Sequence, residues 1–165
     1  MSEHFGSLAE FAEHLIEVEI GMREALEQGL QRVAALVERT AKSEIGIYQP
    51  ETGGFPEWPE LADSTKDERA RLGFSENDPL LRTGELRDSI ERQVEGLEAQ
   101  IGSADERMAF HEFGTSKMPA RPVLGPAAFR NKEVIQKLVG AAVVSGLIGA
   151  DQIHSALGYD FSTKD

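Results

Sequence analysis

The feature that most constrains the fold is a helical pattern that occupies the N-terminal part of the chain. Ser7 and Glu10 have the spacing of a capping box, in which a serine begins a helix and a glutamate three residues later reaches back to it. Residues 17–21 are less regular and predict a break. We therefore expect a short helix followed by a long amphipathic helix that ends near Gly46 and forms one wall of the core. The apolar positions at helical spacing are Leu8, Phe11, Ala12, Leu15, Ile16, Met22, Leu26, Leu30, Val33, Val37 and Ala41.

A pattern of period two follows later in the chain. Ile90, Arg92 and Val94 would point to one side of a strand, and after Gly96 the same alternation resumes through residues 97–101. Two alternating runs joined by a turn with glycine predict an antiparallel hairpin with one buried face. Thr83 and Gly84 predict a turn that leads directly into the first strand.

Between these two patterns, residues 48–78 predict a long central loop. The segment is rich in turn residues and carries Tyr48, Phe55 and Trp58, the only tryptophan. Residues 61–72 are compatible with a turn or two of helix, capped by Asp63 or Ser64. Long connections of this kind are usually functional or disordered. The aromatic residues favour a loop that folds onto something, either its own core or a neighbouring subunit.

The stretch from Phe110 to Pro122 has the highest density of unusual residues. A short helix from Glu106 to Phe113 is expected to end at Gly114. An extended arm would follow, because prolines fix φ and restrict the residues before them. Such an arm loses little entropy when it is ordered, so we interpret it as a docking and structural element. Arg121, which lies between two prolines, would form a bidentate pair with a carboxylate of a neighbour or of its own chain.

A second long helical pattern closes the chain. Residues 123–129 are expected to be extended, and Pro126 is suited to the first position of a helix whose apolar residues continue to Val143. Asp151 would cap a final short helix that ends at Gly158, and residues 159–165 would form a flexible tail. The predicted fold is α+β: a long N-terminal helix and a C-terminal helix packed on a small antiparallel sheet, in one domain over residues 1–158.

Composition excludes several classes of function. The 165 residues carry a net charge of -12, which repels phosphate backbones and argues against tight binding of nucleic acid. A basic patch around Lys117, Arg121, Arg130 and Lys132 is an alternative, but a solvated charged face is the simpler interpretation. The absence of cysteine excludes disulfides and thiolate metal sites. No apolar run is long enough for a membrane span and no secretory signal is evident, so we expect synthesis in the cytoplasm.

The sequence contains no complete catalytic set. His111 and Glu112 are the one candidate acid–base pair, but adjacent residues of a helix point to different sides. A zinc-protease signature needs a second histidine where Thr115 stands. A hydrolase built on His111, Glu112 and Asp105 would lack a nucleophile or a metal set. We therefore expect no enzyme activity, metal or cofactor.

The order of short motifs points to a known family. Trp58-Pro-x-Leu61 is followed by Leu80-Leu-Arg-Thr-Gly-Glu-Leu-Arg-Asp-Ser-Ile90, Ile101-Gly-Ser103, His111-Glu-Phe-Gly-Thr115 and Met118-Pro-Ala-Arg-Pro122. This ordered set, over roughly Ala34 to Val144, resembles the phage virion morphogenesis family of tail-completion and head–tail joining proteins. The chain departs from that pattern at Phe110, where a tyrosine would precede His111, and in its glycine-rich C-terminus.

The resemblance implies a structural protein of the phage or prophage tail or neck. It would assemble as a ring, with six-fold symmetry expected, and contact neighbouring tail or head-connector proteins while DNA passes without tight binding. It would be found in the host cytoplasm during assembly and then in the virion. The alternative is a non-catalytic acidic module or regulator that binds a basic protein. Besides the hairpin edges, the residues expected at assembly contacts are Trp58, Thr83, Gly84, Phe113, Gly114, Met118, Arg121 and Pro122.

Overall fold

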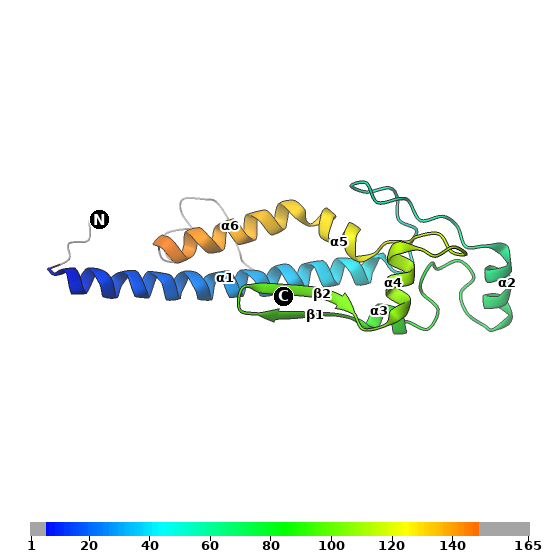
Figure 1. Cartoon of the computed structure of the whole chain (residues 1–165). Helices are drawn as coiled ribbons and strands as arrows, with labels where there is room; N and C mark the ends of the chain where they lie inside the picture. Colours follow the sequence, from blue (N-terminus) through cyan, green and yellow to red (C-terminus); the bar gives the residue numbers. More distant parts are fainter. Residues whose placement is uncertain (1–5, 149–165) are drawn as a thin grey trace.

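A computed structural model describes residues 6–148, and its backbone is organised along one long helix (Figure 1). Helix α1 (Leu8–Glu44) contacts the hairpin of β1 (Ile90–Glu95) and β2 (Glu98–Ser103) on one side and α6 (Lys132–Ile148) on the other. Four short helices gather near the C-terminal end of α1. The α+β prediction is confirmed, with α1 as the helix that mainly covers the hairpin. The short helices are α2 (Asp63–Arg71), α3 (Glu85–Asp88), α4 (Glu106–Phe113) and α5 (Leu124–Arg130).

Helix α1 begins as predicted but has no break. The Ser7 hydroxyl accepts a hydrogen bond from the Glu10 N–H, and the Glu10 carboxylate accepts one from the Gly6 N–H. The expected break at residues 17–21 is wrong, because the helix continues through Gly21 to Glu44. A glycine costs a helix about 1 kcal/mol, and cooperative propagation from both sides offsets that cost in a helix of this length.

The seam between α1 and α6 depends on a small residue. Gly29 is buried, and a Cβ placed on it would lie 3.1 Å from the Ala142 side chain. Near the other end of the seam, the Asn131 amide donates to the Thr40 hydroxyl at 2.9 Å. The helices are therefore in close contact and antiparallel, and α6 ends before α1 reaches its own N-terminus (Figure 1).

The predicted antiparallel hairpin forms, and on one face Ile90 is buried while Val94, Ala99 and Ile101 are half-buried. Ile90 pairs with Ser103 and Glu95 with Glu98, so Gly96 and Leu97 form the two-residue turn. Gly96 has a φ of 56°, which a glycine adopts without steric cost. Ile90 is fully buried. The prediction that the chain enters β1 directly from the Thr83–Gly84 turn is wrong, because the helical turn α3 intervenes.

The central loop folds onto the subunit's own core. Trp58 is buried in the main apolar cluster with Val37, Ile90 and Val123. Helix α2 forms within the predicted range, but neither expected cap is used. Ala62 occupies the N-cap position, and its carbonyl accepts from the N–H groups of Thr65 and Lys66. Asp63 is instead the first helical residue, where a carboxylate is favoured by the helix dipole.

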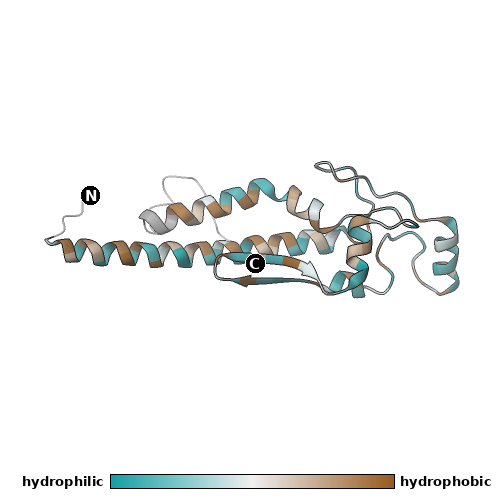
Figure 2. Cartoon of the chain, in the orientation of Figure 1, coloured by the Kyte–Doolittle hydropathy of each residue, from teal (hydrophilic) through white to brown (hydrophobic). Residues whose placement is uncertain are grey.

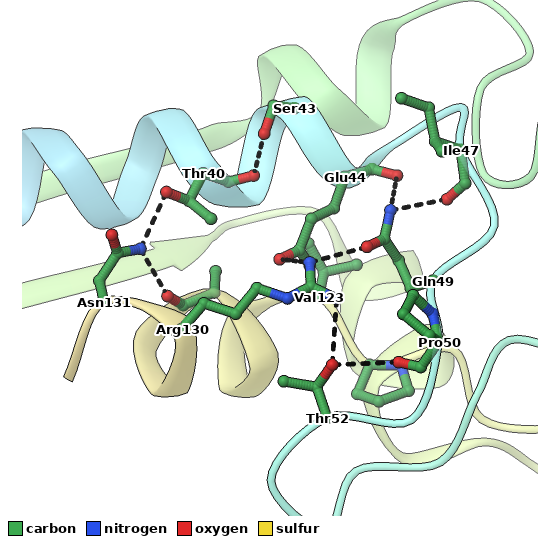
Figure 3. Close-up of polar contacts among 12 residues, drawn as sticks. Thr40, Ser43, Glu44, Ile47, Gln49, Pro50, Thr52, Val123, Arg130 and Asn131 are labelled. Atoms are coloured by element: carbon green, nitrogen blue, oxygen red, sulfur yellow. Dashed lines mark hydrogen bonds and ion pairs between the residues drawn. The ribbon is translucent and has the colours of Figure 1, made fainter. Parts of the chain in front are cut away.

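A partly buried polar network ties the end of α1 to the loop and to α5 (Figure 3). Arg130 donates to the Glu44 carboxylate at 2.6 Å, to the Gln49 side-chain oxygen at 2.7 Å and to the Thr52 hydroxyl at 3.2 Å. Gln49 donates in turn to the carbonyl of Glu44 at 3.1 Å. One arginine of α5 therefore joins the end of α1 and the start of the central loop, which precede it in the sequence by 78 to 86 residues.

The start of the C-terminal helical region differs from the prediction. Helix α5 begins at Leu124, so Pro126 is its third residue rather than the first helical one, and residues 124–129 are helical rather than extended. A separate helix, α6, begins after Asn131. The expected final helix after Asp151 and the flexible tail at 159–165 lie outside the described residues.

Candidate functional site: a cationic pocket beside the proline arm

A pocket of about 530 Å³ opens between α2, α4, the segment from Leu80 to Leu86, and the arm from Lys117 to Arg121. Its most unusual property is charge. One acidic residue, Glu60, stands against five cationic residues in the lining of a protein whose net charge is -12. The cationic residues come from four separate segments and are Arg69, Arg82, Arg107, Lys117 and Arg121.

The walls between these charges are apolar. Leu61, Leu80, Leu86, Met118 and Pro119 line the same pocket, and the first three are buried in the subunit. Leu80 has a φ of 62°, a conformation that costs an L residue with a branched side chain about 1–3 kcal/mol. The fold therefore maintains a strained backbone at the pocket wall. A ligand of this pocket would need both apolar surface and negative charge.

Arg121 lies at the base of the arm and is buried. Its Nε donates to the Pro59 carbonyl at 3.1 Å, and its Nη2 donates to the carbonyls of Pro59 and Glu60 at 2.8 and 3.0 Å. The intrachain partner is thus a pair of backbone carbonyls rather than the carboxylate considered from the sequence. Burial lowers the pKa of Arg121. Carbonyl dipoles satisfy the N–H groups but leave the charge of the guanidinium without a counterion.

Arg69 is held in the same way. It is buried on α2, and its Nη1 donates to the carbonyls of Asp78 and Leu81 at 2.6 and 3.3 Å. Within the described part of the chain, neither Arg69 nor Arg121 has a carboxylate partner. Two buried positive charges therefore contribute to the potential of one pocket, where water screens them less than at an open surface.

The other three cationic residues differ in their contacts. Arg107 pairs with Asp105 and Glu85. Arg82 lies over the ring of Phe74, 5.1 Å from its centre, and Lys117 is exposed. Among the described residues, no carboxylate pairs with Arg82 or Lys117. Their charges are therefore available to an incoming group.

His111 reaches the same pocket from α4. Its Nδ1 is buried and has no hydrogen-bond partner among the described residues. Burial, followed by the nearby charges of Arg121 and Arg107, lowers the pKa of His111. This shift favours the neutral imidazole, which adds a polar atom to the pocket without adding charge.

The residues considered for a hydrolase do not meet at one point. Glu112 accepts hydrogen bonds from the backbone N–H groups of Val123, Leu124 and Gly125 at 2.7, 3.0 and 2.9 Å, so its carboxylate caps the start of α5. Asp105 caps α4 and pairs with Arg107. Of the three, His111 alone lines the pocket. The described residues also contain no group of three histidine or acidic side chains arranged to hold a metal ion.

Comparison with known proteins agrees with the order of motifs in the chain. Residues 8–143 match the Phage virion morphogenesis family. The chain belongs to this family. A curated relative, Mu-like prophage FluMu G protein 1 of Haemophilus influenzae, is 32% identical over 96 residues, which are 58% of this chain and 64% of the relative. No solved structure matches the chain.

Family membership places the chain among proteins that build phage or prophage virions. The described residues include no helix long and apolar enough to cross a membrane. The family match also covers every helix and strand except the last residues of α6, so the pocket is part of the matched region.

The residues expected at assembly contacts fall into three places in this family member. Thr83, Gly84, Met118 and Arg121 line the pocket. Trp58 is buried, and its indole N–H donates to the Pro122 carbonyl at 2.9 Å, so it fixes the arm to the central loop.

The other two residues lie at the end of α4. Phe113 is 81% exposed, and Gly114 ends the helix with a φ of 72° and a ψ of 178°. Half of the expected set therefore lines the cationic pocket, and Phe113 alone presents a large exposed apolar side chain.

The basic patch considered from the sequence is divided between two regions. Lys117 and Arg121 reach the pocket, whereas Arg130 is bound to Glu44 and Lys132 begins α6. Sequence reasoning missed Arg69, Arg82 and Arg107. They lie 52, 39 and 14 residues before Arg121, and no local spacing signals that they converge.

Proposed function

We propose that the chain is a structural component of the phage tail or neck that completes the tail or joins it to the head. In this proposal it acts as one subunit of a homo-oligomeric ring, with six-fold symmetry expected. The observation that carries the proposal is the family match over residues 8–143, supported by the similarity to a Mu-like prophage protein. The ring, its symmetry and the choice of tail or neck go beyond that match.

Features of the subunit support assembly into a ring. The two-stranded sheet leaves the outer edge of each strand unpaired among the described residues, and such edges pair readily with neighbours. A contact between two different surfaces of the same chain generates a closed ring if the rotation closes. The net charge of -12 would let DNA pass through such a ring without binding tightly.

Exposure suggests how the expected contact residues divide their roles. Trp58, Arg121 and Pro122 bond within the subunit, so they would shape the arm rather than touch a neighbour. Phe113 is largely exposed at the end of α4, directly before the arm. We assign Phe113 to a contact with a neighbouring subunit or virion protein, because an exposed ring of this size gains from burial on assembly.

The ring is tested by measuring molar mass with light scattering over a concentration series and imaging any large species by negative-stain electron microscopy. Closed rings of uniform diameter support the proposal and give the symmetry. Phe113→Ser should reduce their yield, while Leu97→Ser at the exposed hairpin turn serves as the matched control. A protein that stays monomeric both alone and with isolated tails would favour the acidic binding module instead.

The role in the virion is tested by deleting the gene from an inducible prophage that encodes this chain. The expected lysate contains separate filled heads and tails, and purified protein added to it should restore infectious particles. The stage of the defect decides between the two finer roles: tails with an abnormal end indicate tail completion, and normal tails that fail to attach indicate joining. Normal virions from the deleted strain would contradict the proposal.

A further inference from the structure

We propose that the cationic pocket of one subunit receives the N-terminal half of α1 from a second copy of the chain, so that subunits associate head to tail. This inference rests on the proposed ring and specifies the contact that builds it. Four features carry the argument: the pocket's charge, its apolar walls, the composition of the N-terminal half of α1, and the opposite positions of the two surfaces.

The pocket selects for an acidic partner. Its lining has five cationic residues against one carboxylate, and Glu60 is already paired with Lys66. Arg69 and Arg121 are fixed by backbone carbonyls and keep their charge, while Arg82 and Lys117 have no carboxylate partner among the described residues. In a protein with 29 acidic and 17 basic residues, this local excess of cations needs a counterpart.

The N-terminal half of α1 has the complementary chemistry. Between Leu8 and Glu27 the helix carries six glutamates and one arginine. On the same turns Leu8, Leu15, Ile16 and Ile20 are between 51 and 83% exposed. Figure 2 shows these hydrophobic turns alternating with hydrophilic ones where α1 extends beyond α6.

The spacing brings acid and apolar groups to one side. Glu13 and Glu17 are one turn apart, and each lies three residues before an exposed isoleucine, Ile16 and Ile20. That side of the helix therefore pairs two carboxylates with two apolar side chains. The pocket pairs cationic residues with the apolar surface of Leu61, Leu80, Leu86, Met118 and Pro119. The helix and the pocket are therefore complementary in charge, and both offer apolar surface.

The geometry makes the contact intermolecular. The elements that line the pocket cluster around the C-terminal end of α1, and the acidic turns lie at its N-terminal end (Figure 1). The continuous 37-residue helix α1 is about 55 Å long at 1.5 Å per residue, so a subunit cannot place this end in its own pocket. The acidic end must enter the pocket of another copy, and repeating that contact yields a ring or a filament.

Charge reversal provides the test. The pocket variant is Arg82→Glu with Lys117→Glu, and the helix variant is Glu13→Lys with Glu17→Lys. All four side chains are outside the buried core, so folding is expected to survive, and circular dichroism checks it. Each variant should associate at least about tenfold more weakly than the wild type, because like charges would then face each other. Arg71→Glu with Glu91→Lys changes exposed residues outside the pocket and serves as the control.

Two combinations separate the contact from a general effect of charge. Each variant alone faces like charges, but in a mixture of the pocket variant and the helix variant both contacts between unlike chains pair opposite charges, so the mixture should assemble with alternating subunits. Placing all four substitutions in one chain reverses both surfaces and should restore self-association. Variants that assemble like the wild type, or a mixture that stays monomeric, overturn the inference.

The same experiment keeps the two proposals distinguishable. If the mixture of the two variants assembles but the wild type grows into open filaments and does not join tails to heads, the contact stands and the proposed ring function fails. If the wild type and both variants form identical closed rings, the ring stands and this contact is wrong. Loss of assembly in the pocket variant with no rescue by the four-fold variant would show that another acidic partner fills the pocket, which also overturns the inference.

Discussion

At the scale of single residues, Glu44 is a buried carboxyl whose hydrogen bonds are only partly satisfied. It is buried at the end of α1, one oxygen accepts from Arg130, and the other oxygen has no partner among the described residues. Burial is the dominant effect and raises the pKa of Glu44 to about 7, although Arg130 acts in the opposite direction. The network in Figure 3 therefore holds a carboxyl that is partly protonated near neutral pH.

Glu44 predicts a pH dependence of stability. Its folded-state pKa lies above the unfolded value of 4.5, so the folded chain binds more protons between pH 4.5 and about 7, and the stability from this group falls as pH rises through that range. Glu44→Gln removes the effect. The free energy of unfolding of the variant minus that of the wild type should rise by about 2 kcal/mol from pH 5 to pH 8. Urea unfolding at several pH values measures the difference, and a difference independent of pH would contradict the assignment.

Gly114 gives a second prediction at this scale. Its φ of 72° and ψ of 178° are nearly restricted to glycine, and an added Cβ would lie 2.9 Å from the backbone nitrogen of Ala120. Gly114→Ala should destabilise the fold by about 3 kcal/mol, because it adds a clash with backbone to the conformational strain.

The matched control for this substitution is Gly96→Ala. Gly96 also has a positive φ, 56°, but a Cβ there meets nothing within 4 Å. Gly96→Ala should therefore lower the free energy of unfolding by only about 1 kcal/mol. Thermal and urea unfolding compare the two variants. Equal losses would show that φ alone, and not the close approach of the arm, sets the requirement for glycine at position 114.

At the scale of elements, Glu112 explains why the arm ends in a helix. Three consecutive backbone N–H groups at the start of α5 donate to its carboxylate. Side-chain capping of this kind satisfies donors that a helix leaves open. Glu112→Ala should lower stability by about 2–3 kcal/mol, since it leaves these partly buried donors without acceptors. The control is Glu106→Ala, at an exposed position of α4, the helix that also carries Glu112. It should change the free energy of unfolding little, and urea unfolding measures both variants.

The central loop is fastened to α5 by two contacts between a glycine and an aromatic ring. A Cβ on Gly53 would lie 2.5 Å from the ring of Phe129, and one on Gly125 would lie 2.5 Å from the ring of Phe55. Gly53→Ala should displace the loop and increase cleavage between residues 50 and 57 in limited proteolysis, with about 1–2 kcal/mol lost. Gly54→Ala has a similar positive φ and no neighbour within 4 Å, so it should leave the loop attached.

At the scale of the whole molecule, the distribution of charge matters more than its sum. The chain is strongly acidic, but five of its 17 cationic residues converge in the lining of one pocket, and six of its 29 acidic residues lie in the N-terminal half of α1, at the other end of that helix. In the proposed contact, these two local charge clusters would orient subunits head to tail as they approach and disfavour the reverse arrangement.

The proposed ionic contact predicts that self-association weakens with salt. Raising the ionic strength from about 0.05 M to about 0.5 M shortens the screening length to a few ångströms and should reduce association by about tenfold or more. Light scattering at fixed protein concentration measures the loss. The four-fold charge-reversed chain should show the same salt dependence, because its contact is equally ionic. Association that strengthens with salt would indicate an apolar contact, such as one through Phe113, as the main source of affinity.

Local sequence rules located most of the elements. The cap at Ser7, the two-residue turn at Gly96, the helix that ends before Gly114 and the α+β class all follow from short-range propensities that the tertiary structure leaves intact. The same rules failed at Gly21, where the cooperativity of a long helix exceeds the cost of one glycine. They also failed at Leu124, where a distant carboxylate sets the start of the helix.

The family and the order of its motifs were already determined by the sequence, because they depend on residues that are close together in the chain. The pocket was decided by the tertiary structure. Arg69, Arg82 and Arg107 lie on different segments, and they meet Arg121 because Trp58 and the carbonyls of Pro59 and Glu60 anchor the arm over the loop. Cationic residues that are dispersed along an acidic sequence form a local cationic surface when the chain folds. Their proximity depends on contacts between distant segments, so it cannot be read from their spacing in the sequence.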